Sequence, residues 1–188
     1  MRQGRPAYRS EAADDWSDYV RHLGFRWHIY GLAVASVVEE GLTQGWLSGE
    51  HIMRFVESGE IIPRAKHPFL HRAVDALCRR DYVTVIHLLV PHLEDTLRSC
   101  TGLLGKPTSS MRGDVAQAKP LPDVLDDDRL NWLLGSGVVA GLKVLLTEQG
   151  GGNLRHDVAH GLITSEQCGP DAVGAVLWAF LRLALYRL

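Results

Sequence analysis

Cysteine is scarce in this sequence, and the three cysteines that occur are far apart. Cys78, Cys100 and Cys168 include no C-x-x-C pair. An odd number of isolated cysteines does not form a disulfide framework. The pattern therefore favours a reduced, cytoplasmic compartment.

Long apolar runs are also missing. The most apolar stretch, Ala172 to Leu181, is interrupted by Arg182 after about ten residues, which is too short to span a bilayer. The first ten residues contain three arginines but no apolar core of a signal peptide. These absences predict a soluble protein with no membrane partner.

No charge of one sign dominates. The formal net charge is -2, so the chain has no general positive field that would attract nucleic acid. Any contact with RNA must therefore come from a local basic patch, one that dimer symmetry could double.

Strand-like alternation is absent, whereas apolar residues recur at helical spacing through most of the 188 residues, of which 46% are hydrophobic. This composition predicts one all-α domain. We expect a flexible arm over residues 1–13, a helical segment over 14–66 in which Gly24 divides two helices, and a helical bundle over 67–188. The connection 105–122, rich in proline, glycine and serine, is expected to be a flexible loop.

Capping residues locate several helices. Ser48 is a predicted N-cap, and Asp81 is the predicted N-cap of the longest helix, which runs to about Leu104 with a kink at Pro91. The last helix, from Pro170 to Leu188, is apolar on almost every face and must be central or shared with a second subunit. The longest helix also carries a polar face: His87, Glu94 and Arg98.

The segment from Asn153 to Gly161 concentrates the chemically useful side chains, and it follows the glycine triplet 150–152. On a regular helix His156 and His160 share one face, whereas Arg155 and His160 point about 140° apart. Arg155 and His160 can therefore meet at one site only if the helix is irregular, or if a second copy supplies one of them.

Arg155, four residues and then His160, within Asn-Leu-Arg-His-Asp-Val-Ala-His-Gly-Leu, resembles the R-x(4–6)-H motif of the HEPN superfamily. The stretch from Asp81 to Arg98 resembles the long helix that precedes this motif in one branch of the superfamily. The resemblance covers roughly 67–188. It implies a HEPN-like helical bundle with additional N-terminal helices, and a homodimeric, metal-independent endoribonuclease of phage defence or toxin–antitoxin systems.

The resemblance also implies roles for individual residues. Arg155 would stabilise the phosphorane charge, and His160 would transfer protons, because arginine matches phosphate oxygens and histidine titrates near neutral pH. His156 and Asn153 would contact the substrate or hold the turn, with Glu94, Arg98 and Asp157 orienting the catalytic pair. The expected partners are RNA, a second copy and an antitoxin or other regulatory protein. No cofactor or metal is expected.

Two alternatives remain open on the residues alone. In a catalytically silent HEPN-type module that binds nucleotide, RNA or protein, Arg155 would pair with Glu94 and His160 would be a packed side chain. The second is a metal-dependent enzyme. In a zinc enzyme, His156 and His160 would bind the metal, Asp157 would stand at the position of the catalytic base, and Glu166 or His87 would be a further ligand. In a metal-dependent helical phosphohydrolase of the HD type, His156 and Asp157 would form the metal-binding dyad.

Overall fold

The structure is a computed structural model that describes residues 11–105, 107–112 and 115–186. Over these residues it contains nine α-helices, two short 3-10 helices and one two-stranded antiparallel sheet. The all-α class expected from the apolar spacing is therefore confirmed. Residues 1–10 of the expected arm lie outside the described residues, and the first helix begins at Glu11.

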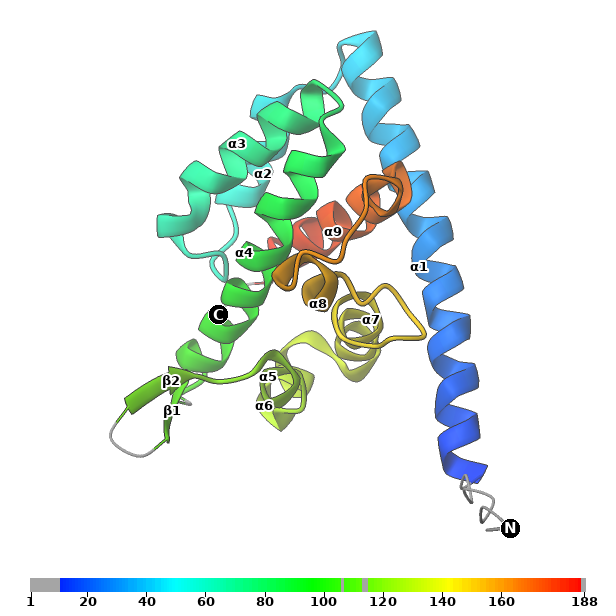
Figure 1. Ribbon diagram of the computed structural model, residues 1–188. Helices are drawn as coiled ribbons and strands as arrows, with labels where there is room; N and C mark the ends of the chain where they lie inside the picture. Colours follow the sequence, from blue (N-terminus) through cyan, green and yellow to red (C-terminus); the bar gives the residue numbers. More distant parts are fainter. Residues whose placement is uncertain (1–10, 106, 113–114, 187–188) are drawn as a thin grey trace, which may run out of the picture.

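Helix α1 (Glu11–Gln44) runs along one side of the molecule as a single helix (Figure 1). The expected division at Gly24 was wrong. Gly24 lies inside α1 and faces the glycine triplet, where a Cβ would lie 3.4 Å from the Cα of Gly151, an ordinary van der Waals contact. The conformational cost of one glycine is about 1 kcal/mol, which packing along the whole helix easily offsets.

Helix α9 (Pro170–Leu183) crosses α1 with its backbone almost in contact. A Cβ at Gly174 would lie 1.9 Å from the carbonyl oxygen of Gly31, and a Cβ at Gly31 would lie 1.9 Å from that of Asp171. These two glycines therefore set the helix separation. Helix α9 ends at Leu183, earlier than expected; residues 187–188 of the predicted helix lie outside the described residues.

Helix α9 is central, the first of the two positions that its apolar sequence allowed, and it lies between α1 and α4 (Tyr82–Leu103) (Figure 1). Val173, Ala175, Val176 and Leu177 are at most 3% exposed, and Phe180 is 1% exposed. Because helices of the same chain cover these side chains, the apolar sequence of α9 needs no second subunit to explain it.

Helices α2 (Gly49–Glu57) and α4 begin where their capping residues predict. The Ser48 hydroxyl accepts a hydrogen bond from the His51 amide at the start of α2. Helix α3 (His67–Cys78) has a proline in its first turn, and the carboxylate of Asp81 accepts the Thr84 amide at the start of α4. Helix α4 continues through Pro91 and buries a long apolar stripe in the core.

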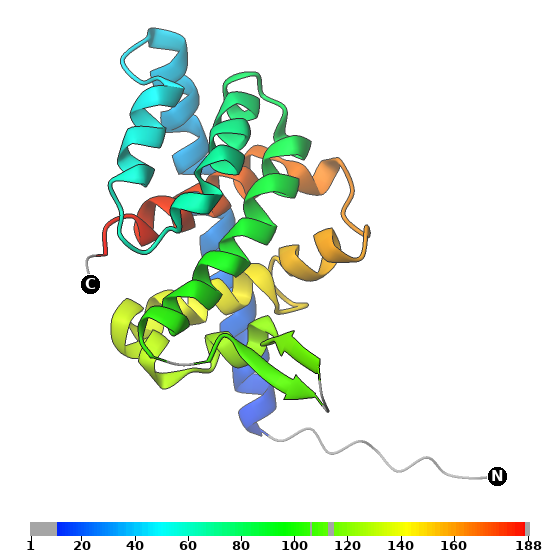
Figure 2. The ribbon, with the colours of Figure 1, turned by 90° about the vertical axis from the view of Figure 1, so that its left-hand side faces the viewer.

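The segment after α4 differs from the expected loop. It forms a β-hairpin, β1 (Ser109–Arg112) and β2 (Val115–Ala118), followed by the short helix α5 (Leu121–Leu125). Figure 2 shows the hairpin beside the end of α4. The expectation that the chain has no strand was wrong here, because neither Ser-Ser-Met-Arg nor Val-Ala-Gln-Ala shows the strict alternation of apolar and polar residues that indicates a strand.

Two further helices, α6 (Asp128–Leu134) and α7 (Ser136–Leu146), lead to the segment that carries the histidines. Asp127 caps α6 by accepting the Arg129 amide. Within the described residues, no single helix has both the length and the apolar character needed to cross a membrane. Helices α6 and α7 reach this length and apolar character only when they are taken together, and the chain bends by 111° between them.

Candidate functional site

The motif segment forms a short helix, α8 (Leu154–Ala159), which begins at Asn153. Asn153 has left-handed backbone angles (φ 47°, ψ 20°), a conformation that asparagine tolerates better than most residues. Its side-chain amide donates to the carboxylate of Asp157 at 3.0 Å. Leu154 is 5% exposed and anchors the helix in the core.

The end of α8 has a structural explanation in its sequence. Gly161 has a φ of +66°, the Gly161 amide donates to the carbonyl of Val158, and the Leu162 amide donates to that of Asp157. These are the two hydrogen bonds of a Schellman motif, in which glycine is favoured because it has no Cβ. The Asn-Leu and His-Gly-Leu parts of the motif therefore serve to begin and end the helix.

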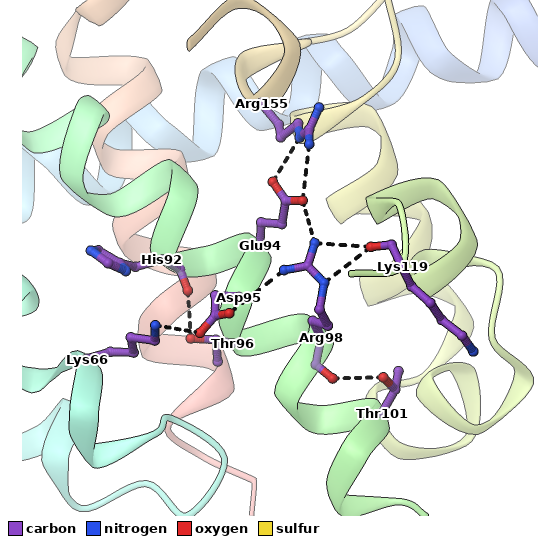
Figure 3. A network of polar contacts seen from close by, with 9 residues as sticks. All are labelled: Lys66, His92, Glu94, Asp95, Thr96, Arg98, Thr101, Lys119 and Arg155. Carbon is purple, nitrogen blue, oxygen red and sulfur yellow. Dashed lines mark hydrogen bonds and ion pairs between the residues drawn. The ribbon is translucent and has the colours of Figure 1, made fainter. Parts of the chain in front are cut away.

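Arg155 points from α8 to α4, where it meets Glu94 (Figure 3). Its Nε donates to Glu94 Oε2 at 2.8 Å, and its Nη2 donates to Oε1 at 3.2 Å. Arg98, one turn further along α4, donates to the same Oε1 at 2.7 Å. Glu94 therefore holds two guanidinium groups, and it contacts Arg155 directly.

The backbone directly after strand β2 completes this network. Arg98 donates through Nε and Nη2 to the carbonyl oxygen of Lys119, at 3.2 and 3.1 Å (Figure 3). Sequence reasoning missed this contact because a backbone acceptor leaves no signal in residue type. Asp95 forms a second pair beside it, 3.8 Å from Arg98 and 2.8 Å from Lys66.

Glu94 is an ionised carboxylate. Burial raises its pKa, but the hydrogen bonds and charges of Arg155 and Arg98 outweigh burial and hold the pKa below its ordinary value of 4.5. The hydrogen bond to Glu94 in turn raises the pKa of Arg155. The three cations of this network, Arg155, Arg98 and Lys66, outnumber its two carboxylates, Glu94 and Asp95, by one positive charge.

The Arg155 side chain is only partly enclosed. It is 36% exposed, whereas those of Glu94 and Arg98 are 13% and 16% exposed. The described residues provide no acceptor for its Nη1, so one edge of the guanidinium is free to bind an anion. Glu94 fixes the opposite edge.

His156 and His160 lie together on another part of α8. Their ring centroids are 4.4 Å apart, as the spacing of four residues predicts. Both side chains are exposed, and their ring nitrogens make no hydrogen bond to the described part of the protein. Nothing in the fold of the described residues therefore accounts for the choice of histidine at these two positions.

Arg155 and His160 do not meet within one chain. No hydrogen bond, ion pair or ring contact joins them among the described residues. His160 follows the last helical residue (φ -102°, ψ 2°), and this departure from helical angles does not bring it to Arg155. The structure thus joins Arg155 to Glu94 and His156 to His160, as two separate contacts.

The metal alternative requires a cluster of ligands. In the described ranges, no group of three or more histidine, cysteine, aspartate or glutamate side chains is arranged to hold a metal ion. His156 and His160 are therefore not joined by Glu166 or His87 as further ligands, and the donor set does not fit a zinc helix.

A cavity of about 340 Å³ lies beside α8, between α1 and the glycine triplet. Arg21, Phe25 and His28 line it from α1, and the ring of His28 is 2.9 Å from the carboxylate of Asp171. The sequence contained no signal for this cavity, because its walls come from segments more than 100 residues apart.

No family model, curated protein or solved structure matches this chain. The all-α class is established by the helices themselves, and the case for a function depends on α8 and its contacts with α4.

Proposed function

We propose that this chain is an endoribonuclease of the HEPN type, which cleaves RNA without a metal ion at a site built by two copies. Arg155 and His160 are its catalytic pair. The observation that carries the proposal is that two exposed histidine side chains are not used in the fold of the described residues. The other polar side chains of α8 and its cap, Asn153, Arg155 and Asp157, bond to neighbouring residues, whereas His156 and His160 are exposed without a hydrogen-bonding partner among the described residues.

The proposed reaction transfers two protons and exchanges one phosphorus–oxygen bond for another. The 2′-hydroxyl oxygen attacks the adjacent phosphorus, the bond to the 5′-oxygen breaks, and a 2′,3′-cyclic phosphate forms. One His160 accepts the proton of the 2′-hydroxyl, and the His160 of the second copy donates a proton to the departing 5′-oxygen. Arg155 binds the phosphate oxygens as negative charge develops on them.

Two features of the contacts support this division of roles. Glu94 accepts two hydrogen bonds from one edge of the Arg155 guanidinium, and these bonds orient the group before an anion arrives. The Nη1 of Arg155 has no acceptor among the described residues. Arg98 adds a second positive charge behind Glu94. This local excess of positive charge attracts the phosphate of RNA, which the net charge of the whole chain does not do.

The need for two copies follows from the direction of the side chains. Arg155 and His160 point about 140° apart on an α-helix, and α8 retains helical geometry from Leu154 to Ala159. We therefore place the phosphate between two copies, where two Arg155 and two His160 side chains surround it. The role is that of a cytoplasmic nuclease in phage defence or in a toxin–antitoxin pair, with RNA as substrate and an antitoxin or other regulatory protein as partner.

The contact between Arg155 and Glu94 also favours a second candidate function. A carboxylate that takes two of the guanidinium donors competes with a phosphate for Arg155. In a catalytically silent HEPN-type module this pair would fasten α8 to α4, and the histidines would contact a bound nucleotide, RNA or protein without chemistry.

One set of variants tests the proposal against both alternatives. Purified protein is incubated with mixed RNA, with and without EDTA, beside Arg155→Lys, Arg155→Ala and His160→Ala, and circular dichroism verifies helix content. His22→Ala is the matched control, because His22 is an exposed histidine on α1 far from the motif in sequence.

We expect cleavage that survives EDTA, is lost in the three motif variants and is retained in His22→Ala. Cleavage that persists in both alanine variants would overturn the assignment. Cleavage that EDTA abolishes would move the chemistry to a metal ion, and RNA binding without cleavage would favour the silent module.

A further inference from the structure

A second concave site lies on a different part of the protein, where α1, α2 and α9 meet. It is a groove of about 480 Å³, and neither Arg155 nor the two histidines of α8 line it. Its walls are mainly aliphatic and aromatic. They include Val38, Ile52, Phe55, Leu177 and Leu181.

The rim of this groove leaves apolar surface in contact with water. Phe55 is 40% exposed and Leu185 is 54% exposed, although both side chains line the same groove as the buried Ile52 and Leu177. Exposed apolar side chains that gather around a concavity are typical of a binding site.

Arg182 is the feature that gives the groove its chemistry. Its Nε is buried and has no hydrogen-bond acceptor, and its guanidinium lies 5.4 Å from the ring centroid of Tyr186. No described residue that lines the groove is acidic. By contrast, the guanidinium groups of Arg98 and Arg155 are both held by Glu94.

No described carboxylate pairs with Arg182, so a bound anion would neutralise a charge that the protein leaves unpaired. A carboxylate is the natural acceptor, because it matches the fork of a guanidinium and neutralises its charge. The remainder of the groove is apolar and favours a hydrocarbon chain. A purely apolar ligand would leave Arg182 unpaired. A small polar acid would leave the apolar walls of the groove in contact with water.

We propose that this groove binds an aliphatic carboxylate, such as a free fatty acid of medium chain length. The carboxylate pairs with Arg182, and the chain lies along Leu181, Leu177 and Phe55. The volume falls within the usual range of small-molecule sites, about 300–1,000 Å³. The proposal is independent of the ribonuclease, because the two sites share no residue.

Isothermal titration calorimetry with decanoate tests this site, with 1-decanol as the uncharged ligand of equal chain length. We expect decanoate to bind at one site per chain. Arg182→Met should weaken decanoate binding about 10-fold or more, the loss of one charge-assisted hydrogen bond. It should leave 1-decanol binding unchanged.

Two further variants provide controls for charge and for folding. Arg54→Met removes the same charge from an exposed arginine on α2, which pairs with Glu50 and does not line the groove; it should change decanoate binding by less than about 2-fold. Phe55→Gln alters only the exposed rim and should weaken binding of both ligands about 3-fold or more.

Three results would overturn the proposal. They are equal affinity for decanoate and 1-decanol, equal loss in Arg182→Met and Arg54→Met, and no binding of decanoate by the folded protein. If sedimentation shows a dimer that Leu181→Asp dissociates, a second copy occupies the groove and the fatty-acid assignment falls.

Discussion

The ion pair between α8 and α4 allows a direct measurement of how firmly Arg155 is held. Glu94→Gln preserves the shape of the side chain but removes the charge that accepts hydrogen bonds from Arg155 and Arg98. We predict that this substitution lowers the free energy of unfolding, and that part of the loss depends on Arg155. A double-mutant cycle with Arg155→Gln isolates that part.

The expected magnitude follows from the exposure of the three side chains. Removing one member of a fully buried pair costs about 3–5 kcal/mol, whereas exposed pairs contribute about 0–1 kcal/mol. Glu94 and Arg98 are near the buried limit, at 13% and 16% exposed, so Glu94→Gln should cost about 2 kcal/mol. Arg155 is 36% exposed, which reduces its coupling with Glu94 to about 1 kcal/mol.

Urea unfolding followed by circular dichroism measures all four free energies of the cycle. A coupling energy below about 0.3 kcal/mol would refute the reasoning, because independent sites add within that margin. The pH dependence provides a second check. Since the folded-state pKa of Glu94 lies below its ordinary value of 4.5, its contribution is fully present above that pH and disappears as the pH falls through the folded-state pKa.

Two glycine substitutions should destabilise the protein for different reasons. Gly31→Ala forces a Cβ to within 1.9 Å of the Asp171 carbonyl oxygen and should lower the free energy of unfolding in urea by about 3 kcal/mol or more. Ser36→Ala, at an exposed position on the same helix, should be nearly neutral. Equal effects of the two substitutions would contradict the close crossing of α1 and α9. Gly161→Ala meets no atom but requires a φ of +66°, so it should cost about 1 kcal/mol, or about 2–4 °C in Tm. Gly137→Ala, in the open first turn of α7, should not lower Tm.

Local signals in the sequence predicted much of the helical structure. Ser48 and Asp81 cap their helices as expected, because an N-cap depends on a side chain and an amide two or three residues away. The apolar sequence of α9 likewise predicted that it is either central or shared with a second subunit, because burial of a helix on all sides requires apolar residues on all sides.

Long-range contacts could not be predicted in the same way. Gly24 was interpreted as a helix boundary, whereas its partner, the glycine triplet, lies more than 120 residues further along the chain. A glycine that ends a helix and a glycine in the interior of a helix look alike in one sequence. The sequence also left open whether α9 is buried by its own chain. In the structure, α1 of the same chain packs against it.

The candidate site shows the same limit. The spacing of four residues predicted that His156 and His160 share a face, and their rings are in contact. The partner of Arg155 depended on which helix lies opposite α8. The sequence offered both a phosphate and Glu94 for that role; the structure has Glu94 on one edge of the guanidinium and leaves the other edge open.

The chemical identity of the RNA ends tests the proposed ribonuclease most directly. Wild-type protein and His160→Ala are incubated with a defined RNA in EDTA, and the products are analysed by mass spectrometry. Attack by the 2′-hydroxyl predicts 2′,3′-cyclic phosphate and 5′-hydroxyl ends from the wild type and no products from the variant. Products with 3′-hydroxyl and 5′-phosphate ends, or the same cleavage by His160→Ala, would contradict the proposal.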